Sequence, residues 1–240
     1  MTVNFRKIFR RLEQEMRNAD YEVRARVSKI LPRVDNDVPF VCQFASPEHA
    51  ELSLMKQLKP RDDLDWRESG ATSPERYADW AFTMCGMAST AMVLRSFFDA
   101  SPLPAELAED ALKHGVYQET AGEISDMRYR EYATWITKYN LRAKVYTRLS
   151  IHGIKHALSN GRLVMISVNP NIRGVVTAAV NQRGGHLVLV TGYDTNAGTI
   201  TINNPSGFAS QGSQLHHTLA VKVFKKYFAG RGIVLIRNDS

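Results

Sequence analysis

The sequence predicts an α+β domain in which a helical half packs on a mostly antiparallel sheet. Apolar residues recur at helical spacing in most segments up to residue 139, whereas later segments are mostly rich in Val, Ile, Leu and Thr and bounded by Gly, Asn or Pro. The chain has 240 residues, of which 44% are hydrophobic and 23% charged. This composition is typical of a globular protein with one substantial core.

The longest predicted element is an amphipathic helix over residues 4–31, ended by Pro32. We interpret it as a helix that packs against the body of the domain, in preference to a membrane-surface helix. The other predicted helices span residues 47–58, 85–98, 104–113, 126–139 and 151–158. The predicted strands span residues 38–42, 142–147, 163–168, 186–193, 199–203 and 232–237, and residues 59–74 are predicted to form a surface loop.

Positive charge is concentrated at the N-terminus of the chain. Residues 1–34 hold nine Lys or Arg and four acidic residues, a net charge of +5 out of +7 for the whole chain. No nucleic-acid motif accompanies them, so we expect a solvated helix face and no nucleic-acid partner. We therefore divide the chain into an amphipathic basic helix at 1–34 and a domain at 35–240.

The chain has no apolar run of the roughly 18 to 20 residues that cross a bilayer, and no signal peptide. We therefore expect a cytoplasmic protein without a transmembrane segment. The only two cysteines, Cys42 and Cys85, are interpreted as reduced thiols. His152 and His156 have metal-ligand spacing, but no carboxylate or cysteine accompanies them, so neither a metal nor another cofactor is predicted.

Cys85 is a candidate nucleophile. It opens a predicted buried helix and is followed by the small residues Gly86, Ala88 and Ser89. The unpaired N–H groups and the positive dipole end of a helix N-terminus stabilise a thiolate, so this position predicts a lowered thiol pKa. Gly86 leaves space for a substrate backbone, and the Cys85 N–H is a potential oxyanion donor. A buried structural cysteine is the alternative interpretation.

His186 is the candidate base. It follows Gly184 and Gly185 and opens an apolar strand, and the next predicted strand ends in the turn at Asn203 and Asn204. In a hairpin, the start of the first strand lies beside the end of the second. His186 and the Asn203/Asn204 turn are therefore expected to be neighbours, which is the geometry of a Cys-His-Asn triad.

These residues carry a family resemblance. The sequence is similar to papain-like cysteine peptidases related to the bacteriocin-processing, double-glycine leader peptidases, in their stand-alone branch. The matching segments are Val-Pro-Phe-Val-Cys-Gln at 38–43, Cys-Gly at 85–86 with nearby small residues, Gly-His-Leu-Val-Leu-Val-Thr-Gly-Tyr at 185–193 and Ile-Asn-Asn-Pro-Ser-Gly at 202–207. The resemblance implies a papain-like fold, Cys85 as nucleophile, His186 as base, Asn204 as orienter and a glutamine in the oxyanion hole.

The sequence departs from the family at three places. Met87 replaces the usual proline after Cys-Gly, and Asn204 replaces the usual aspartate. The residues just before Cys85 contain no glutamine, and Asp79 stands six positions before it. We favour Gln43 as the oxyanion residue. An extended segment there would turn Cys42 the opposite way, so we do not expect a disulfide with Cys85.

The predicted function is a cysteine peptidase or amidase that acts on a peptide or protein through a thioester. Gly86, Gly184 and Gly185 suggest a narrow groove for extended peptides with small side chains, covered by a flap at residues 175–183. Two alternatives keep the fold: an acyltransferase or peptide-modifying enzyme, and an inactive relative that binds peptide. The sequence does not define the oligomeric state.

Overall fold

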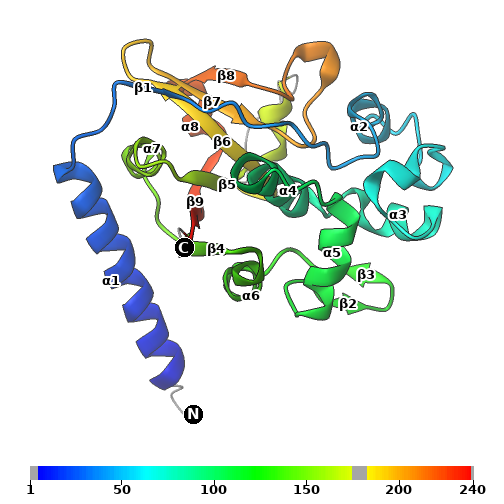
Figure 1. Cartoon of the computed structure of the whole chain (residues 1–240), viewed down its shortest axis with the longest axis horizontal. Coiled ribbons are helices and arrows are strands. Elements are labelled where there is room, and N and C mark those ends of the chain that lie inside the picture. Colours follow the sequence, from blue (N-terminus) through cyan, green and yellow to red (C-terminus); the bar gives the residue numbers. More distant parts are fainter. Residues whose placement is uncertain (1–4, 175–182, 239–240) are drawn as a thin grey trace.

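The computed structural model describes residues 5–174 and 183–238 (Figure 1). Its centre is a seven-stranded antiparallel sheet with the order β4-β9-β5-β6-β7-β8, and β1 pairs with β6. The strands are β1 (Arg33–Asp35), β4 (Leu141–Tyr146), β5 (Leu163–Val168), β6 (His186–Asp194), β7 (Thr199–Asn203), β8 (His217–Ala220) and β9 (Phe228–Arg237). A separate two-stranded sheet pairs β2 (Glu119–Thr120) with β3 (Glu123–Ile124).

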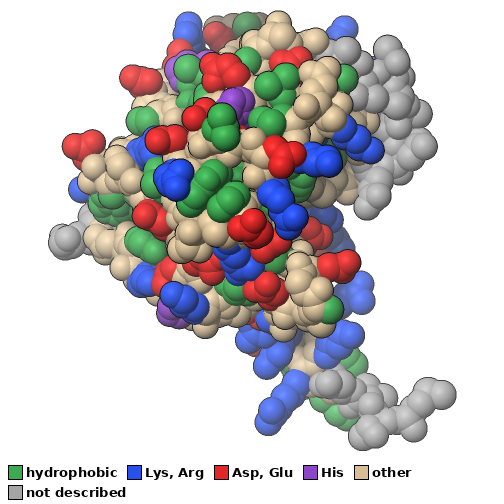
Figure 2. Space-filling model, turned by 90° about the vertical axis from the view of Figure 1, so that its right-hand side faces the viewer, with side chains coloured by type: hydrophobic (Ala, Val, Ile, Leu, Met, Phe, Trp, Pro, Cys, Tyr) green, Lys and Arg blue, Asp and Glu red, His purple; other side chains and the backbone are tan. Residues whose placement is uncertain are grey.

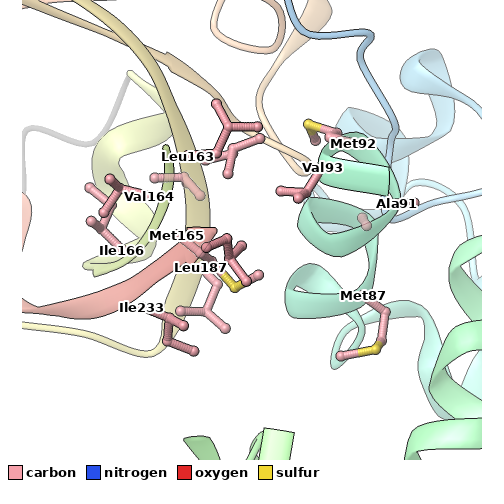
Figure 3. Close-up of a cluster of buried hydrophobic side chains, with 14 of the residues drawn as sticks. Met87, Ala91, Met92, Val93, Leu163, Val164, Met165, Ile166, Leu187 and Ile233 are labelled. Carbon is pink, nitrogen blue, oxygen red and sulfur yellow. The ribbon is translucent and has the colours of Figure 1, made fainter. Parts of the chain in front are cut away.

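The core lies between helix α4 (Cys85–Phe98) and the sheet. Figure 3 shows Val93 of the helix pointing toward the strand side chains, among them Leu163 and Leu187, whereas Met87 and Ala91 lie on the side of the helix away from the sheet. Val164 and Ile166 point to the other face of the sheet, as the alternation along a strand requires. Helix α7 (Ile151–Ser159) also packs on β5 and β6. This packing fixes Cys85, at the first position of α4, against the start of β6.

Serine caps begin several helices. Ser46, Ser73 and Ser150 each accept a backbone N–H three residues ahead, which satisfies one of the unpaired donors of the first turn. The remaining α-helices are α1 (Phe5–Val27), α2 (Pro47–Leu54), α3 (Pro74–Ala81), α5 (Pro104–Lys113), α6 (Tyr129–Trp135) and α8 (Val221–Tyr227). Short 3₁₀ helices lie at Pro60–Asp62, Trp66–Ser69, Ile136–Tyr139, Pro170–Arg173 and Ala209–Gln211.

Helix α1 contacts the body with a face that carries polar side chains together with the buried Tyr21 and Ala25. Asn18 donates to Thr147 Oγ1 at 2.8 Å, the Tyr21 hydroxyl donates to the Gly153 carbonyl at 2.8 Å, and Glu22 accepts from the Ser150 backbone N–H at 2.8 Å. We predicted a helix that packs against the body, and an amphipathic helix usually does so through its apolar side. Here the apolar side faces outward instead.

The α+β architecture agrees with the prediction, and most predicted elements lie within a few residues of their observed bounds. The predicted strand at residues 38–42 is wrong, because this segment has no strand partner, and the first strand is β1 instead. Helices α3 and α8 and strands β2, β3 and β8 were not predicted. The predicted flap at residues 175–183 lies, except for Arg183, outside the described residues.

None of the helices in residues 5–174 and 183–238 is, by itself, long and apolar enough to span a membrane. Only the pair α3 and α4, bent at 94° to each other, meets the length and composition criteria jointly.

Candidate active site

The sulfur of Cys85 meets the first residues of β6. The backbone N–H groups of Leu187 and of Gly86 lie close enough to it to lower the pKa of the thiol. Leu187 directly follows His186, so the sulfur lies next to the residue that carries the candidate base. The packing of α4 on β6 thus brings the helix start that carries Cys85 to the strand start that carries His186.

Burial sets the protonation state of the Cys85 thiol. Loss of hydration raises its pKa above the ordinary value, although the Leu187 and Gly86 N–H groups and the Arg173 charge lower it in part. The predicted low pKa is therefore wrong for this resting site, because desolvation outweighs the helix terminus. At neutral pH the group is a thiol.

His186 is held by Asn204 across the β6–β7 hairpin. The His186 Nε2 lies 2.8 Å from Asn204 Oδ1, and the Ser206 backbone N–H donates to the same oxygen at 3.2 Å. An amide oxygen that accepts from Ser206 also accepts from His186, so the imidazole proton sits on Nε2. This tautomer leaves the lone pair on Nδ1 as the proton acceptor.

Arg173 and Ser206 complete the polar network. The Arg173 guanidinium donates from Nη2 to Ser206 Oγ at 2.6 Å and from Nε to the Ser206 carbonyl at 2.7 Å, and Ser206 Oγ lies 3.2 Å from His186 Nε2. Burial and the Arg173 charge lower the pKa of His186 to about 3, although the Asn204 hydrogen bond raises it in part. The imidazole is therefore neutral at physiological pH.

The sequence signals for these two residues differ. Ser206 belongs to the Asn-Asn-Pro-Ser-Gly segment at 203–207, whose first residues we singled out. Arg173 ends a 3₁₀ helix in a segment without a motif. Burial lowers the pKa of its guanidinium to about 10, and the nearby Cys85 opposes that effect.

Replacing Arg173 with glutamine is expected to move the acid limb of the kcat/KM profile to higher pH. Without the cation the pKa of His186 rises from its depressed value, so the imidazole loses its basic form at a higher pH. We also expect kcat/KM to fall about tenfold, because a charge that stabilises the thiolate is lost. The matched control is Arg130→Gln, on the exposed side of α6. An unmoved acid limb would show that Arg173 does not act on the histidine.

Gln43 lies between the Asn204 turn and the segment that leads to Cys85. Its backbone N–H donates to the Pro205 carbonyl at 2.8 Å, and its side-chain Nε2 donates to the Ala81 carbonyl at 2.8 Å. Its Oε1 is buried without a hydrogen-bond partner among the described residues. Asp79, the alternative, is exposed on α3, and its Oδ2 lies 3.4 Å from Arg76 Nη1.

Cys42 and Cys85 are both free thiols. The Cys42 sulfur donates to the Pro205 carbonyl at 3.3 Å, and burial raises its pKa to about 12. Each cysteine thus has surroundings of its own, in agreement with the expectation that Cys42 and Cys85 form no disulfide with each other.

The three glycines proposed to bind substrate differ in their surroundings. A Cβ on Gly86 would lie 2.6 Å from Met127 Sδ, so a flexible side chain occupies that space. A Cβ on Gly184 would lie 2.5 Å from Arg231 Nη2, whereas one on Gly185 would meet, among the described residues, only Pro170, at 4.0 Å. Both Gly184 and Gly185 have positive φ, which favours glycine at these two positions. Gly185 is the most open of the three.

One group of side chains among the described residues has metal-like proximity: His49, Asp63 and Asp65. The His49 Nδ1 lies 2.9 Å from Asp63 Oδ1, and its Nε2 lies 3.8 Å from Asp65 Oδ2. One nitrogen of His49 and one oxygen of each carboxylate lie within 4.8 Å of one another, and the two ring nitrogens place the imidazole between the two carboxylates.

Comparisons with solved structures find similar folds. The chain matches a putative C39-like peptidase from Bacillus anthracis with a TM-score of 0.51 and 16% identity, over 87% of this chain and 99% of that one. It also matches a double glycine motif protease from an AMS/PCAT transporter in complex with its leader peptide (TM-score 0.41, 20% identity, 65% and 83% covered). A third match is the peptidase domain of Streptococcus ComA, a bi-functional ABC transporter of quorum sensing (TM-score 0.40, 14% identity, 63% and 90% covered).

The fold shared with the C39-like peptidase is papain-like, with the central helix packed on an antiparallel sheet, as predicted. No curated protein matches the sequence significantly. A comparison with protein families matches residues 49–232, which include Cys85, His186 and Asn204. Since this match covers most of the chain and agrees with the fold, the chain belongs to the Peptidase_C39 like family, which is related to the bacteriocin-processing peptidases.

Proposed function

We propose that this protein is a cysteine peptidase that cleaves peptide bonds through a thioester on Cys85. One observation carries the proposal: the Cys85 sulfur lies near the N–H of Leu187, the residue after His186, and the His186 Nε2 lies 2.8 Å from Asn204 Oδ1. A nucleophile, a base and an amide that orients the base are the three parts of a papain-like triad. Family membership supports peptidase chemistry at this site.

The proposed reaction begins from a neutral pair. As the Cys85 sulfur attacks the peptide carbonyl carbon, its proton passes to His186 Nδ1, and the carbonyl π electrons move to the oxygen. The tetrahedral intermediate collapses, and the amine leaves with the proton that His186 returns. Water then gives a proton to His186 and attacks the thioester, and the released thiolate regains that proton. Arg173 stabilises the transient thiolate, since its charge lowers the pKa of Cys85.

The proposed oxyanion donors are the Cys85 backbone N–H and Gln43. The Cys85 N–H is at the start of α4, where backbone donors have no partner within the helix. The Gln43 amide gives one N–H to the Ala81 carbonyl, four residues before Cys85, and its second N–H is the proposed donor. The Gln43–Pro205 hydrogen bond ties this amide to the turn that carries Asn204.

The proposed substrate is an extended peptide with small side chains at the cleavage point. The open surroundings of Gly185, beside His186, favour close approach of a substrate backbone. Incubating the full chain with a library of such peptides is expected to yield cleaved products, and rapid acid quenching is expected to trap an acyl group on Cys85. Aminolysis in place of hydrolysis, with an amine acceptor present, would identify an acyltransferase. If no peptide gives a cleaved product or an acyl adduct, the proposal of a peptidase is wrong and a protein that only binds peptides is indicated.

Alkylation of Cys85 by iodoacetamide is expected to accelerate steadily from pH 7 to pH 9. Because its pKa is raised, the thiolate fraction grows roughly tenfold per pH unit over this range. Mass spectrometry of labelled peptides measures both cysteines in one experiment, and the more deeply buried Cys42, with its pKa of about 12, is the internal control. A labelling rate for Cys85 that is constant from pH 5 to pH 9 would mean a thiolate–imidazolium pair and would contradict the neutral resting site.

A further inference from the structure

Helix α1 presents an apolar stripe to the outside of the protein. Its members follow one another at helical spacing, so they share one face. They and their exposed fractions are Phe5 (68%), Phe9 (63%), Leu12 (54%), Met16 (72%), Val23 (61%) and Val27 (80%). We call this face the outer stripe.

The opposite face of α1 is fixed to the body by polar contacts, so the helix has little freedom to rotate the outer stripe inward. Gln14 donates to the Val145 carbonyl at 2.9 Å, and the Ala25 carbonyl lies 2.9 Å from His152 Nε2. Asn18, Tyr21 and Glu22 add the hydrogen bonds described above. Figure 1 shows α1 at the edge of the molecule, with the sheet and the other helices all to one side. A flat surface can therefore reach the outer stripe without meeting the body.

The first eight residues of α1 are either apolar or basic. Residues 5–12 consist of four large apolar side chains, Phe5, Ile8, Phe9 and Leu12, and four basic ones, Arg6, Lys7, Arg10 and Arg11. All eight are exposed. Figure 2 shows this end of the helix projecting beyond the body, with Lys and Arg side chains along it. An apolar face flanked by cations is complementary to a surface that is apolar beneath and negatively charged above.

The charged residues of α1 disfavour a second copy of the chain as the partner that covers the outer stripe. A parallel, in-register pairing of two outer stripes would bring the basic halves of both helices together. It would also place Glu15 of one copy opposite Asp20 of the other, a like-charge pair at the positions that flank a coiled-coil seam.

We propose that α1 docks the protein on an anionic phospholipid surface, with the outer stripe inserted into the interface and the basic residues of its N-terminal half at the headgroups. The helix is about 35 Å long and would lie in the plane of the membrane without crossing it. This binding is independent of the peptidase activity and leaves the sheet and Cys85 on the water side of α1.

Vesicle flotation with the full chain tests the proposal. We expect binding to phosphatidylcholine vesicles that contain phosphatidylglycerol, weakening as salt is raised, and much less to phosphatidylcholine alone. The double variant Phe5→Ser/Phe9→Ser is expected to lower the partition coefficient about tenfold for each side chain. Arg10→Glu/Arg11→Glu is expected to lower it at least fivefold per residue on anionic vesicles.

The matched control is Leu64→Ser, which removes an even more exposed apolar side chain (90%) from the body. It is expected to bind vesicles as the wild type does, and unchanged melting temperatures would confirm that all variants fold. Equal binding to neutral and anionic vesicles, or none at low salt, would overturn the proposal. A dimer in analytical ultracentrifugation that Phe5→Ser/Phe9→Ser dissociates would overturn it in favour of a second copy.

Discussion

Replacing Cys85 with alanine is expected to reduce kcat/KM for peptide cleavage roughly 10⁴-fold or more, because the atom that forms the thioester is gone. The fold should survive, since Cys85 is only partly buried and alanine suits the first turn of a helix. The same substitution should abolish the acyl adduct in the acid-quench experiment. Both readouts follow from one atom, so they are expected to disappear together.

The control is Cys42→Ser, which keeps a donor of similar size near the Pro205 carbonyl. We expect its kcat/KM to stay within about threefold of the wild type. If Cys42→Ser were inactive and Cys85→Ala active, the nucleophile would be Cys42 and the proposed site would be wrong. If both variants cleaved peptide at the wild-type rate, the hydrolysis would not proceed through a protein thioester at all.

The meeting of His186 and Asn204 was predictable because it depends on local geometry. An apolar strand, a short loop and a second strand specify a hairpin, and the hairpin brings its two outer ends together. Leu189 pairs with Asn203 at the open end of the hairpin. His186 on one strand and Asn204 after the other lie beyond this pair, at the same end. The site of Cys85 was predictable in the same way, since the small and apolar residues that follow it indicate a buried helix.

The electrostatics of the site were not predictable, because they depend on contacts between distant segments. The Cys85 pKa follows from how completely the sheet covers the sulfur, and the sequence pattern contains no measure of that burial. Arg173 reaches the site through Ser206, which lies more than thirty positions later in the chain. Propensity rules describe residues that are neighbours along the chain, so they do not predict a contact between distant residues such as Arg173 and Ser206.

The segment at residues 38–42 shows how a strand-like sequence can form no strand. Its apolar residues Val38 and Val41 are buried, as in a strand, but its backbone polar groups find other partners. Asn203 Nδ2 donates to the Val38 carbonyl at 2.9 Å, and the next residue, Gln43, donates to the Pro205 carbonyl. The hydrogen bonds of an extended chain are satisfied by a side chain and a turn in place of a strand ladder.

Replacing Gly207 with alanine is expected to destabilise the protein by about 2–4 kcal/mol, because its backbone contacts another backbone. A Cβ at this position would lie 2.5 Å from the Ser213 carbonyl carbon and 2.8 Å from the Gln214 nitrogen, and closer still to the Ser213 oxygen. Backbone atoms cannot rotate away as a side chain can. Relief requires the segment that carries Asn204 and Ser206 to move, so we expect the melting temperature to fall by roughly 5–15 °C and kcat/KM to fall as well.

Gly212→Ala is the matched control, because it makes the same change five residues later in the same loop. No atom of residues 5–174 and 183–238 lies within 4 Å of the Cβ that it adds, and its φ of +58° leaves the cost of a left-handed alanine, about 1 kcal/mol. The difference between the two variants therefore isolates the steric contact from the loss of glycine flexibility. If Gly207→Ala melted no lower than Gly212→Ala, the turn would be loose enough to accept a methyl group. A loose turn would not hold Asn204 in a fixed position behind His186, and the orienting role of Asn204 would be lost with it.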